Sequence, residues 1–341
     1  MKLKKFEGNP ILAPFPGNEW ESLVTCNPGV YYDHGTFYML YRAAGNDTEH
    51  VIRLGLATSK DGFHFERQSD KPVFAPSLDG PDAGCVEDPR IVKFDNEYYI
   101  TYAYRPVPPG QYWKFAHDEV SVPACGRYAP AAIVKNLGNT GLAVTKDFKD
   151  FRRLGRLTSP VLDDRDVILF PEKINEQFVM LHRPKQYIGK EYGVDYPSIW
   201  VKFSDDILNW ENKKSYLLLS GQEGTWEEKI GGSTPPLKTE KGWLVLYHGV
   251  EHGGRGYYRV GAMLLDLNNP LKIISKTKRF ILEPEMVFET QGYYNGCVFP
   301  TGNVIVNDTL FVYYGGAGKY VCVATCSISE LLSFLLTECK L

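Results

Sequence analysis

The sequence predicts an all-β fold, a five-bladed β-propeller with a short C-terminal helix, from three observations. Five aromatic-rich runs recur along the chain, at 37–42, 98–103, 178–183, 243–248 and 310–315. Each is followed by a run rich in small residues, at 55–61, 141–147, 200–206, 261–267 and 321–327. Strand pairs that return at a near-constant spacing indicate a sheet repeated around one axis. Because repeats of roughly 68 residues fill the chain, we expect a single domain over residues 1–341.

Turn residues before the aromatic runs predict that the first two strands of a blade form a hairpin. DHG at 33–35, DN at 95–96 and EKG at 240–242 each interrupt β-branched and aromatic residues. Asp, Asn and Gly favour tight turns between strands. One position of the second strand recurs in all five repeats and is occupied by Tyr41, Tyr102, His182, Tyr247 and Tyr314.

The spacing is longest between the second and third repeats, where residues 105–140 are rich in Pro and Gly. This segment is too long for a plain connection. It is predicted to be either a substrate lid that sets specificity or a tolerated surface insertion.

The last segment, 327–338, predicts a helix that begins at a serine cap. Its apolar residues form one broad face, made of Leu331, Leu332, Phe334, Leu335 and Leu336. We expect this helix to seal the last blade. A dimer contact is the alternative, so a homo-oligomer stays open.

Charge and composition limit the classes of partner. A net charge of −3 gives no broad positive field, so we expect no nucleic-acid partner. No apolar run is long enough to suggest a membrane span or a secretory signal, so we expect a cytoplasmic protein, or a periplasmic one if a signal has been removed. The seven cysteines are odd in number and scattered, which favours reduced thiols over disulfides or a zinc site.

Polar residues recur at the first, inner strand of each repeat, beside otherwise apolar sequence. They are Asn27, the run 87–90 (EDPR), the run 164–166 (DRD), Lys229 and Asn295. One buried charge usually means a structural ion pair. Ionisable groups from several blades that converge on one axis instead predict a site.

Six long motifs follow one another along the chain: VEDPRI at 86–91, DRDVILFPEKI at 164–174, LHRP at 181–184, the run 229–250, YYRVGAMLLDL at 257–267 and LEPE at 282–285. In sequence and in order they resemble the motifs of glycoside hydrolase family 130, the inverting β-mannoside phosphorylases and related β-1,2-mannosidases. The resemblance covers nearly the whole chain, and such a series is more specific than one short motif. Segments 105–140 and 224–232 depart from the family pattern.

The resemblance implies a function and a set of site residues. It implies inverting phosphorolysis of β-1,4- or β-1,2-linked mannosides to α-mannose 1-phosphate, with Asp88 as the general acid; without the family, an Asp88–Arg90 ion pair is an equal reading. It implies phosphate ligands at Lys146, Arg165, Lys229 and His248. It places the sugar against Asn27, Arg42, Arg90, His182, Arg183, Tyr258 and Asn295, with Tyr41 and Tyr102 as further walls.

The expected partners are therefore a β-linked manno-oligosaccharide or mannosyl disaccharide and inorganic phosphate as co-substrate. No organic cofactor or metal is expected, because the basic side chains balance the anion and no ligand cluster of the usual spacing appears.

Three other functions remain open at this stage. An inverting β-1,2-mannosidase of the same family would use Glu227, Glu228 or Glu251 to activate water. A non-catalytic sugar-binding propeller is a second alternative, since fold alone never determines activity. A five-bladed glycosidase of another family, with a carboxylate triad, would require an acid in blade one, where this chain has Asn27.

Overall fold

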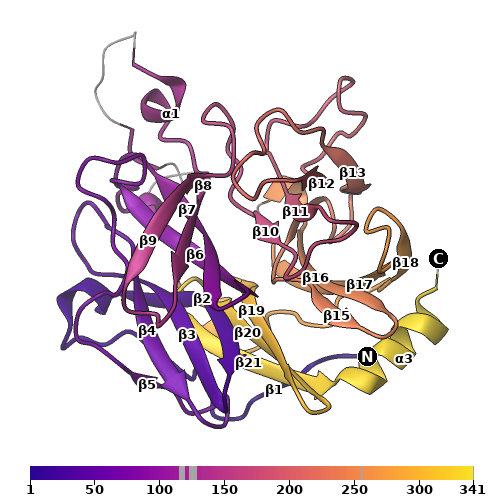
Figure 1. Ribbon diagram of the computed structural model, residues 1–341. Coiled ribbons are helices and arrows are strands. Elements are labelled where there is room, and N and C mark those ends of the chain that lie inside the picture. Colours follow the sequence, from indigo (N-terminus) through magenta and orange to yellow (C-terminus); the bar gives the residue numbers. More distant parts are fainter. Residues whose placement is uncertain (115–119, 123–128, 255, 341) are drawn as a thin grey trace.

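Five antiparallel sheets surround one axis and form the blades of a β-propeller (Figure 1). The computed structural model describes residues 1–341 apart from 115–119, 123–128, 255 and 341. Four of the sheets have four strands, and the sheet of blade four has a fifth, short strand. The predicted all-β class and the five blades are confirmed.

In blades one to four the strands follow the sequence from the axis outward. Blade one contains β2 (Val24–Asp33), β3 (Thr36–Ala44), β4 (Arg53–Ser59) and β5 (Glu66–Arg67). Blade two contains β6 (Cys85–Phe94), β7 (Glu97–Arg105), β8 (Asn139–Thr145) and β9 (Phe151–Arg156). Blade three contains β10 (Ile168–Leu169), β11 (Phe178–His182), β12 (Ile199–Ser204) and β13 (Tyr216–Leu219).

Blade four contains β14 (Lys229–Gly232), β15 (Leu237–Thr239), β16 (Gly242–Val250), β17 (Tyr258–Leu265) and β18 (Ile273–Lys276). Both β14 and β15 pair with β16, so together they form an interrupted inner strand. Blade five contains β19 (Val298–Val306), β20 (Thr309–Gly316) and β21 (Tyr320–Ser327). The aromatic-rich and small-residue runs of the sequence are therefore the second and third strands of every blade.

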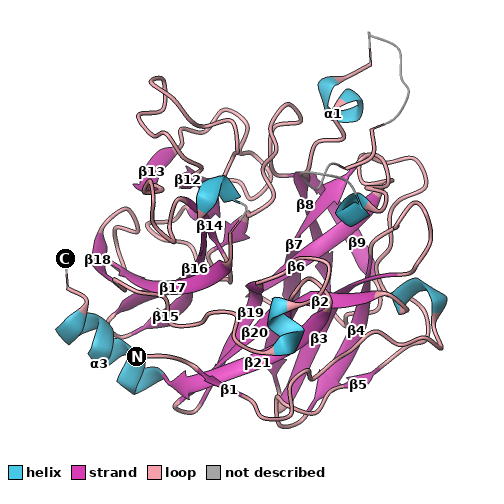
Figure 2. Ribbon diagram, turned by 180° about the vertical axis from the view of Figure 1, so that it is seen from behind, coloured by secondary structure: helices cyan, strands magenta, loops and turns pink. Residues whose placement is uncertain are grey.

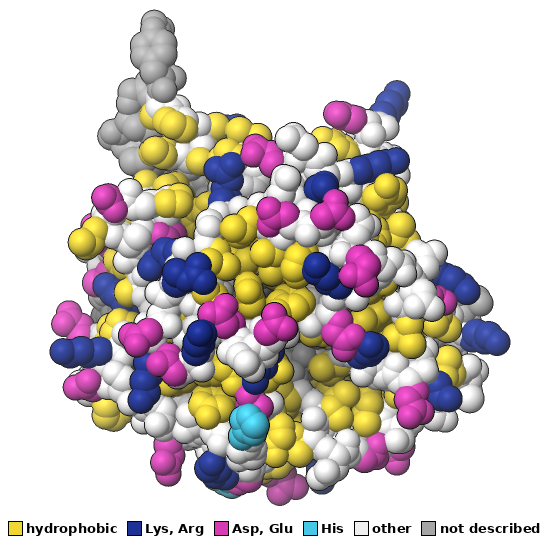
Figure 3. All heavy atoms as spheres, viewed as in Figure 1, with side chains coloured by type: hydrophobic (Ala, Val, Ile, Leu, Met, Phe, Trp, Pro, Cys, Tyr) yellow, Lys and Arg dark blue, Asp and Glu magenta, His cyan; other side chains and the backbone are white. Residues whose placement is uncertain are grey.

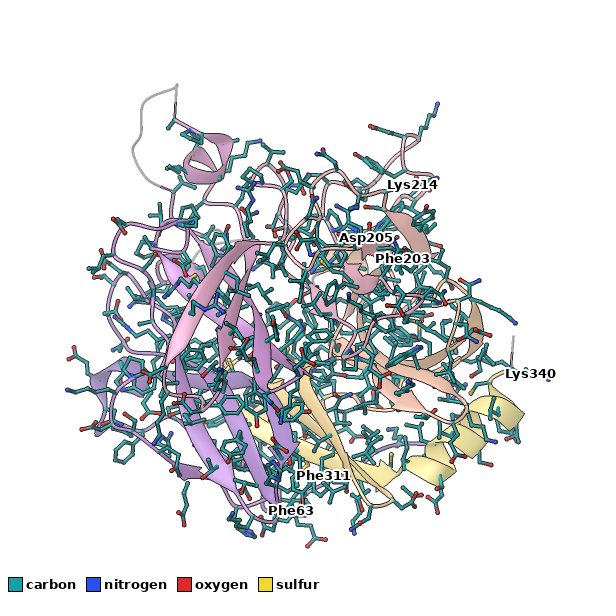
Figure 4. All side chains as sticks on the ribbon, in the orientation of Figure 1. Phe63, Phe203, Asp205, Lys214, Phe311 and Lys340 are labelled. Carbon is teal, nitrogen blue, oxygen red and sulfur yellow. The ribbon has the colours of Figure 1, made fainter. Side chains whose placement is uncertain are left out.

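Blade five is completed by the N-terminal end of the chain. Strand β1 (Lys4–Lys5) pairs with β21, with Lys4 opposite Thr325. On the neighbouring side, Phe63 of blade one lies against Phe311 of β20, with ring centroids 5.2 Å apart (Figure 4). The propeller is thus closed by the pairing of the N-terminal strand β1 with blade five and by ring packing between blades one and five.

Four of the blades each contain a buried polar cluster, here called the tyrosine clasp, which links the inner, second and outermost parts of that blade. In each, a hydroxyl of the second strand donates to a carboxylate that precedes the inner strand, and a cation of the outermost strand binds the same carboxylate. The four clasps are Tyr41–Glu21–Arg67, Tyr102–Asp82–Arg153, Tyr247–Glu227–Lys276 and Tyr314–Glu289–Lys5.

The third strand leaves room for these tyrosine rings. Tyr41 lies over Gly55, where a Cβ atom would come within 2.2 Å of the ring, and Tyr247 lies over Gly261 in the same way. Blade three differs, because His182 donates from Nδ1 to Asp164 (2.8 Å) and its Nε2 meets Ser215 Oγ (3.1 Å). The residues at the recurring position of the second strand therefore bind buried carboxylates of their own blade and stabilise the fold.

Two inner strands contain a β-bulge at the same place. The pairing register shifts between Cys26 and Gly29 in β2, and between Glu87 and Arg90 in β6. At each bulge a residue other than glycine takes a positive φ, 44° for Asn27 and 53° for Asp88. Bulges re-aim side chains, and strained backbone of this kind collects at functional sites.

The predicted C-terminal helix is confirmed as α3 (Ile328–Glu338), capped by Ser327, whose hydroxyl accepts from the Glu330 amide. Its buried residues Ile328, Leu331 and Leu335 join a core that includes strands of blades four and five. The helix lies along the edge of these two blades (Figures 1 and 2). The shorter helices are η1 (Glu19–Glu21), η2 (Tyr112–Lys114), α1 (Ala131–Val134), η4 (His252–Gly254) and α2 (Val287–Thr290).

The predicted insertion connects β7 to β8 and rises above the propeller at α1 (Figure 1). Residues 115–119 and 123–128 of it lie outside the described residues. Its described start folds back onto blade one, where the Gly110 amide donates to the Glu49 carbonyl at 2.9 Å. One side of the insertion therefore lies across the end of the axis.

The described cysteines 26, 85, 297, 322, 326 and 339 are all free thiols, as expected, and Cys125 lies outside the described residues. No helix among the described residues is long and apolar enough to cross a membrane. On the face shown in Figure 3, acidic and basic side chains are interspersed.

Candidate active site

A cavity of about 630 Å³ opens at the end of the axis that the insertion borders. Residues of all five blades line it, among them Asn27, Asp88, Arg165, Lys229 and Phe299. A cavity of this size suits a ligand of a few rings. The arrangement confirms that polar positions of separate repeats converge.

The cavity is positively charged although the whole chain carries −3. Among the described residues, seven cationic side chains line it, namely Arg42, Arg105, Lys135, Arg165, Arg183, Lys185 and Lys229. The carboxyl groups of the described lining are four, namely Glu87, Asp88, Asp163 and Asp166. The formal excess of three positive charges in this described lining favours the binding of an anion.

Asp88 is the carboxyl group of the cavity that is best suited to hold a proton. One of its oxygens accepts from the Asn27 amide (2.8 Å) and from Arg42 Nη1 (3.2 Å). Burial raises the pKa of Asp88, and neighbouring Glu87 adds to this, while Arg42 acts in the opposite direction without overcoming it. A carboxyl group with a raised pKa can still deliver a proton near neutral pH.

Glu87, next in sequence, behaves in the opposite way. Its carboxylate lies 2.8 Å from Arg42 Nη1 and 3.7 Å from Arg165 Nη1. Burial alone would raise the pKa of Glu87, but these two arginines outweigh it and the pKa is lowered. Two adjacent carboxyl groups with pKa values shifted apart are typical of a site in which one is ionised and the other donates.

A cluster of cations faces the cavity from blades three and four. Arg165 Nε donates to Asp163 (2.9 Å), and Lys185 Nζ donates to the other oxygen of the same carboxylate (3.1 Å). Lys229 Nζ donates to the Tyr258 hydroxyl at 3.1 Å. Asp163 and, at 3.7 Å, Glu87 partly balance Arg165 and Lys185, whereas Lys229 has no ion pair with a carboxylate of the described residues, so the cluster has capacity for a further anion.

The lysines of this cluster have strongly lowered pKa values. Burial, together with nearby Arg183 and Arg165, lowers the pKa of Lys229 to about 7. Arg165, followed by burial, lowers the pKa of Lys185 to about 7. Mutual repulsion among cations is relieved when an anion binds, so this site is built to accept one.

His248 and Asp166 form the wall between the cations and the axis. Burial lowers the pKa of His248 to about 3, so its imidazole is neutral, with Nδ1 3.3 Å from the Ser233 hydroxyl. Arg183 Nε donates to Asp166 (3.1 Å), and the pKa of Asp166 is low because Arg183, together with Arg90, outweighs its burial.

Arg90 lies behind the cavity and does not line it. Its Nε donates to the Ser233 carbonyl at 2.7 Å, and Nη1 donates to the Asp88 carbonyl at 3.2 Å. Nη2 lies 3.5 Å from Asp166. Arg90 therefore positions the bulge and the wall, and the structure does not bring it into the described cavity lining, where a direct sugar contact was expected.

Lys146 is not in the cavity, which corrects the prediction that it holds phosphate. Its side chain is 72% exposed and its nearest acidic partner is Glu97, at 3.8 Å. Strand β8 leaves the cavity end near Asn136 and runs seven residues before Lys146. At ~3.3 Å per residue this places Lys146 toward the opposite end of the propeller.

Four further sugar-contact predictions are corrected as well. His182 is buried with Asp164 and borders a separate cavity of about 250 Å³. Asn295 is exposed in a turn, where its side-chain oxygen accepts from the Gly292 amide. Tyr41 and Tyr102 are buried in their clasps. Sequence spacing identified these residues as special without revealing that their partners lie within their own blades.

The three glutamates proposed as a hydrolytic base also lie outside the cavity lining. Glu227 belongs to the clasp of blade four, where it accepts from Tyr247 (2.6 Å) and Lys276 (2.7 Å). Glu228 accepts from the Gly224 and Gly253 amides. Glu251 pairs with Arg259 at 2.9 Å. This part of the hydrolase alternative is corrected, because each carboxylate is already engaged elsewhere.

Several cavity residues were given no individual role from sequence. Glu87 belongs to the polar run 87–90 and Lys185 directly follows LHRP, so both had a signal in their neighbours. Arg105 and Tyr112 belong to the segment 105–140, which was predicted to be a substrate lid or a surface insertion, but no motif singled out either residue. Among the described residues, no group of three His, Cys, Asp or Glu side chains could hold a metal ion.

Comparison with known proteins gives consistent results. A family model described as β-1,4-mannooligosaccharide phosphorylase matches residues 2–337. The chain is 38% identical to a 1,2-β-oligomannan phosphorylase of Thermoanaerobacter sp. strain X514, over 97% of this chain and 99% of the relative. It is 36% identical to a β-1,2-mannobiose phosphorylase of the same organism, over 95% and 96%.

Among solved structures, it is similar to a β-1,2-mannobiose phosphorylase from Listeria innocua in complex with β-1,2-mannobiose. The TM-score is 0.78 at 26% identity, covering 98% of this chain and 99% of the other.

Proposed function

This chain belongs to glycoside hydrolase family 130, and from that premise we propose that it is a β-mannoside phosphorylase. The names of its relatives at 38% and 36% identity support phosphorolysis of β-linked mannosides. The observation that carries the proposal is the cation cluster of Arg165, Lys185 and Lys229 in the same cavity as Asp88.

The favoured substrate is a β-1,2-linked manno-oligosaccharide. The two relatives above are named for β-1,2-linked substrates, and so is the structure from Listeria innocua. These relatives match more closely than the β-1,4-mannooligosaccharide phosphorylase of Ruminococcus albus, which is 25% identical. We expect the linkage preference to be set by the acceptor side of the cavity, and the insertion residues Pro109 and Tyr112, which line the cavity, are candidates for that side.

In the proposed reaction Asp88 is the general acid. It gives its proton to the departing glycosidic oxygen, directly or through a sugar hydroxyl, as the bond to the anomeric carbon breaks. Phosphate oxygen attacks the opposite face of that carbon, so the configuration inverts. The products are α-mannose 1-phosphate and a mannoside shortened by one unit.

Arg165, Lys229 and His248 are the proposed phosphate ligands, joined by Lys185. The three cations supply charge-assisted hydrogen bonds to a phosphate dianion. Neutral His248 can donate one ring N–H to a phosphate oxygen while its other nitrogen meets Ser233. Inorganic phosphate serves as co-substrate.

The mannosyl unit is proposed to lie among Asn27, Arg42, Arg183 and Tyr258, which all line the cavity. Amide and guanidinium groups bind sugar hydroxyls, and an aromatic ring packs against the C–H face of the sugar. Lys229 fixes the Tyr258 hydroxyl at 3.1 Å, so the sugar site and the phosphate site share a wall.

The test is a substrate panel with and without phosphate. We expect β-1,2-mannobiose or β-1,2-mannotriose to be cleaved only when phosphate is present, and faster than β-1,4-mannobiose. Cleavage at the same rate in phosphate-free buffer would contradict phosphorolysis. Preference for the β-1,4 substrate would contradict only the linkage.

A further inference from the structure

The start of the insertion is anchored to two other blades. Gly110 N donates to the Glu49 carbonyl (2.9 Å) and Gln111 Nε2 donates to the Asp47 carbonyl (3.0 Å), both in blade one. The Trp113 ring lies between His50 and Tyr293, at centroid distances of 4.5 and 4.9 Å. The turn η2 is therefore held across the cavity from blade two to blades one and five.

This anchoring brings Tyr112 to Arg42. The Tyr112 hydroxyl accepts from Arg42 Nη2 at 3.2 Å, inside the cavity lining. The other terminal nitrogen, Nη1, contacts Glu87 (2.8 Å) and Asp88 (3.2 Å). Among the described residues, Arg42 Nε is buried without a hydrogen-bond partner. The position of this guanidinium is thus set by two carboxylates on one side and by the insertion on the other.

We propose that Tyr112 is a positioning residue for the proton donor: by holding Arg42 Nη2 at the insertion, it keeps the guanidinium from pairing with Asp88 through both terminal nitrogens. The inference rests on the proposed role of Asp88 as general acid. Under this proposal, the insertion 105–140 contributes to proton donation through Tyr112, in addition to forming part of the cavity wall.

The physical argument concerns what Arg42 would do without that hydroxyl. A buried guanidinium N–H that loses its acceptor is left unsatisfied, and a carboxylate within reach is the strongest replacement. A second N–H directed at Asp88 favours its ionised form, so the proton would be released at lower pH. The fraction of Asp88 that still holds its proton when the substrate arrives would therefore be smaller.

Of the groups that face Asp88, Arg42 is the one whose change of position would alter the pKa of Asp88 most. The others are Glu87 and Arg90 of β6, Cys26 of β2, Cys297 before β19, and Tyr112 itself. Burial raises the pKa of Tyr112 and of Cys26 to about 12 and that of Cys297 still higher, so these groups are neutral near pH 7. Arg90 is fixed by the Ser233 carbonyl.

The experiment is the pH profile of kcat/KM for β-1,2-mannobiose at saturating phosphate, for the wild type and Tyr112→Phe. We expect the alkaline limb of the Tyr112→Phe profile to lie about one pH unit lower than that of the wild type. On that limb kcat/KM should be roughly tenfold lower than in the wild type, and at acidic pH it should recover toward the wild-type value. Lys114→Ala, an exposed change in the same turn, is the matched control and should leave the limb in place.

Two results would overturn the inference: an alkaline limb at the wild-type pH, or a loss of rate that is equal at every pH, which would make Tyr112 only a part of the wall. Asp88→Asn tests the proposed function separately. If Asp88→Asn is inactive and the limb of Tyr112→Phe does not move, only this inference fails. If Asp88→Asn keeps the wild-type rate, the acid assignment itself fails.

Discussion

At the scale of single residues, the site depends on neighbours with opposite tasks. Glu87 and Asp88 are adjacent in sequence, yet Arg42 and Arg165 lower the pKa of the first while burial raises the pKa of the second. The β-bulge makes this possible, because it sends consecutive side chains into different surroundings. Acidity in this cavity is therefore a property of backbone geometry as well as of charge.

Replacing Asp88 with Asn should abolish turnover without unfolding the protein. The amide keeps the size and the hydrogen bond to Asn27, but it has no proton to give, so we expect kcat to fall by about 10²–10⁴-fold. Circular dichroism and thermal unfolding should match the wild type. Asp95→Asn, an exposed turn residue with φ of 52°, is the control; a fully active Asp88→Asn variant would remove Asp88 from the mechanism.

The lowered lysine pKa values predict how phosphate affinity changes with pH. Lys185 and Lys229 have pKa values of about 7, so each carries its positive charge below that pH and loses it above. We therefore expect the KM for phosphate to rise between pH 7 and 9, by up to about tenfold per pH unit for each lysine that is lost. Steady-state kinetics at varied phosphate measures it.

Lys229→Arg is the control for that prediction. Arginine stays charged throughout this range, so the variant should show a smaller rise in KM than the wild type, even if its KM at pH 7 is higher. A wild-type KM for phosphate that is constant from pH 7 to 9 would refute the assignment of these lysines.

At the scale of elements, the tyrosine clasp explains why a tyrosine recurs in the second strand of the repeats. It also explains why the sequence alone did not show that this position is structural. The second-strand tyrosines recur because each must meet a carboxylate and a cation, and the glycines of the third strand make room for the rings. The carboxylate precedes the inner strand and the cation comes from the outermost strand. The pattern of residues along one strand cannot reveal a contact whose three partners come from three separate segments of the blade.

Strand polarity also limited what could be predicted. Asp88, Arg165 and Lys229 were found because they belong to inner strands or the loops that enter them, close to the axis. Lys146 follows a third strand that runs away from the cavity. Its sequence motif matched the family, but the strand carries the side chain away from the other predicted phosphate ligands. Insertion residues such as Tyr112 reach the cavity by a path that no repeat predicts.

The clasp leads to a prediction for Glu227, which as a hydrolytic base would be essential for activity. In the clasp it accepts from Tyr247 and Lys276, so Glu227→Gln should lower the free energy of unfolding by about 1–3 kcal/mol. The kcat with phosphate should stay near the wild-type value. Exposed Glu240→Gln is the control. Loss of turnover in a fully folded Glu227→Gln variant would favour the base.

At the scale of the whole molecule, the propeller is closed by its two chain ends. Leu3 is 6% exposed, its amide donates to the Ile281 carbonyl (2.8 Å), and it joins a core shared with blades four and five. Five blades around one axis bring the acid of blade two and the cations of blades three and four into one cavity. Closure therefore fixes the distance across the cavity.

Leu3→Ala should accordingly destabilise the entire domain. Removing a buried leucine side chain typically costs about 2–5 kcal/mol, and because the core joins two blades we expect one cooperative transition at lower denaturant. Leu78→Ala, at a position 101% exposed, should change nothing. If blade five unfolded in a separate early transition, the closure argument would be wrong.

The central claim is that phosphate, and not water, attacks the mannosyl carbon from the face opposite Asp88. The most direct measurement follows the first turnovers on β-1,2-mannobiose by ³¹P and ¹H NMR in phosphate buffer. We predict α-mannose 1-phosphate as the initial product, one equivalent for each bond cleaved. Free mannose as the only product from the mannosyl unit, formed at a rate independent of phosphate, would contradict the account.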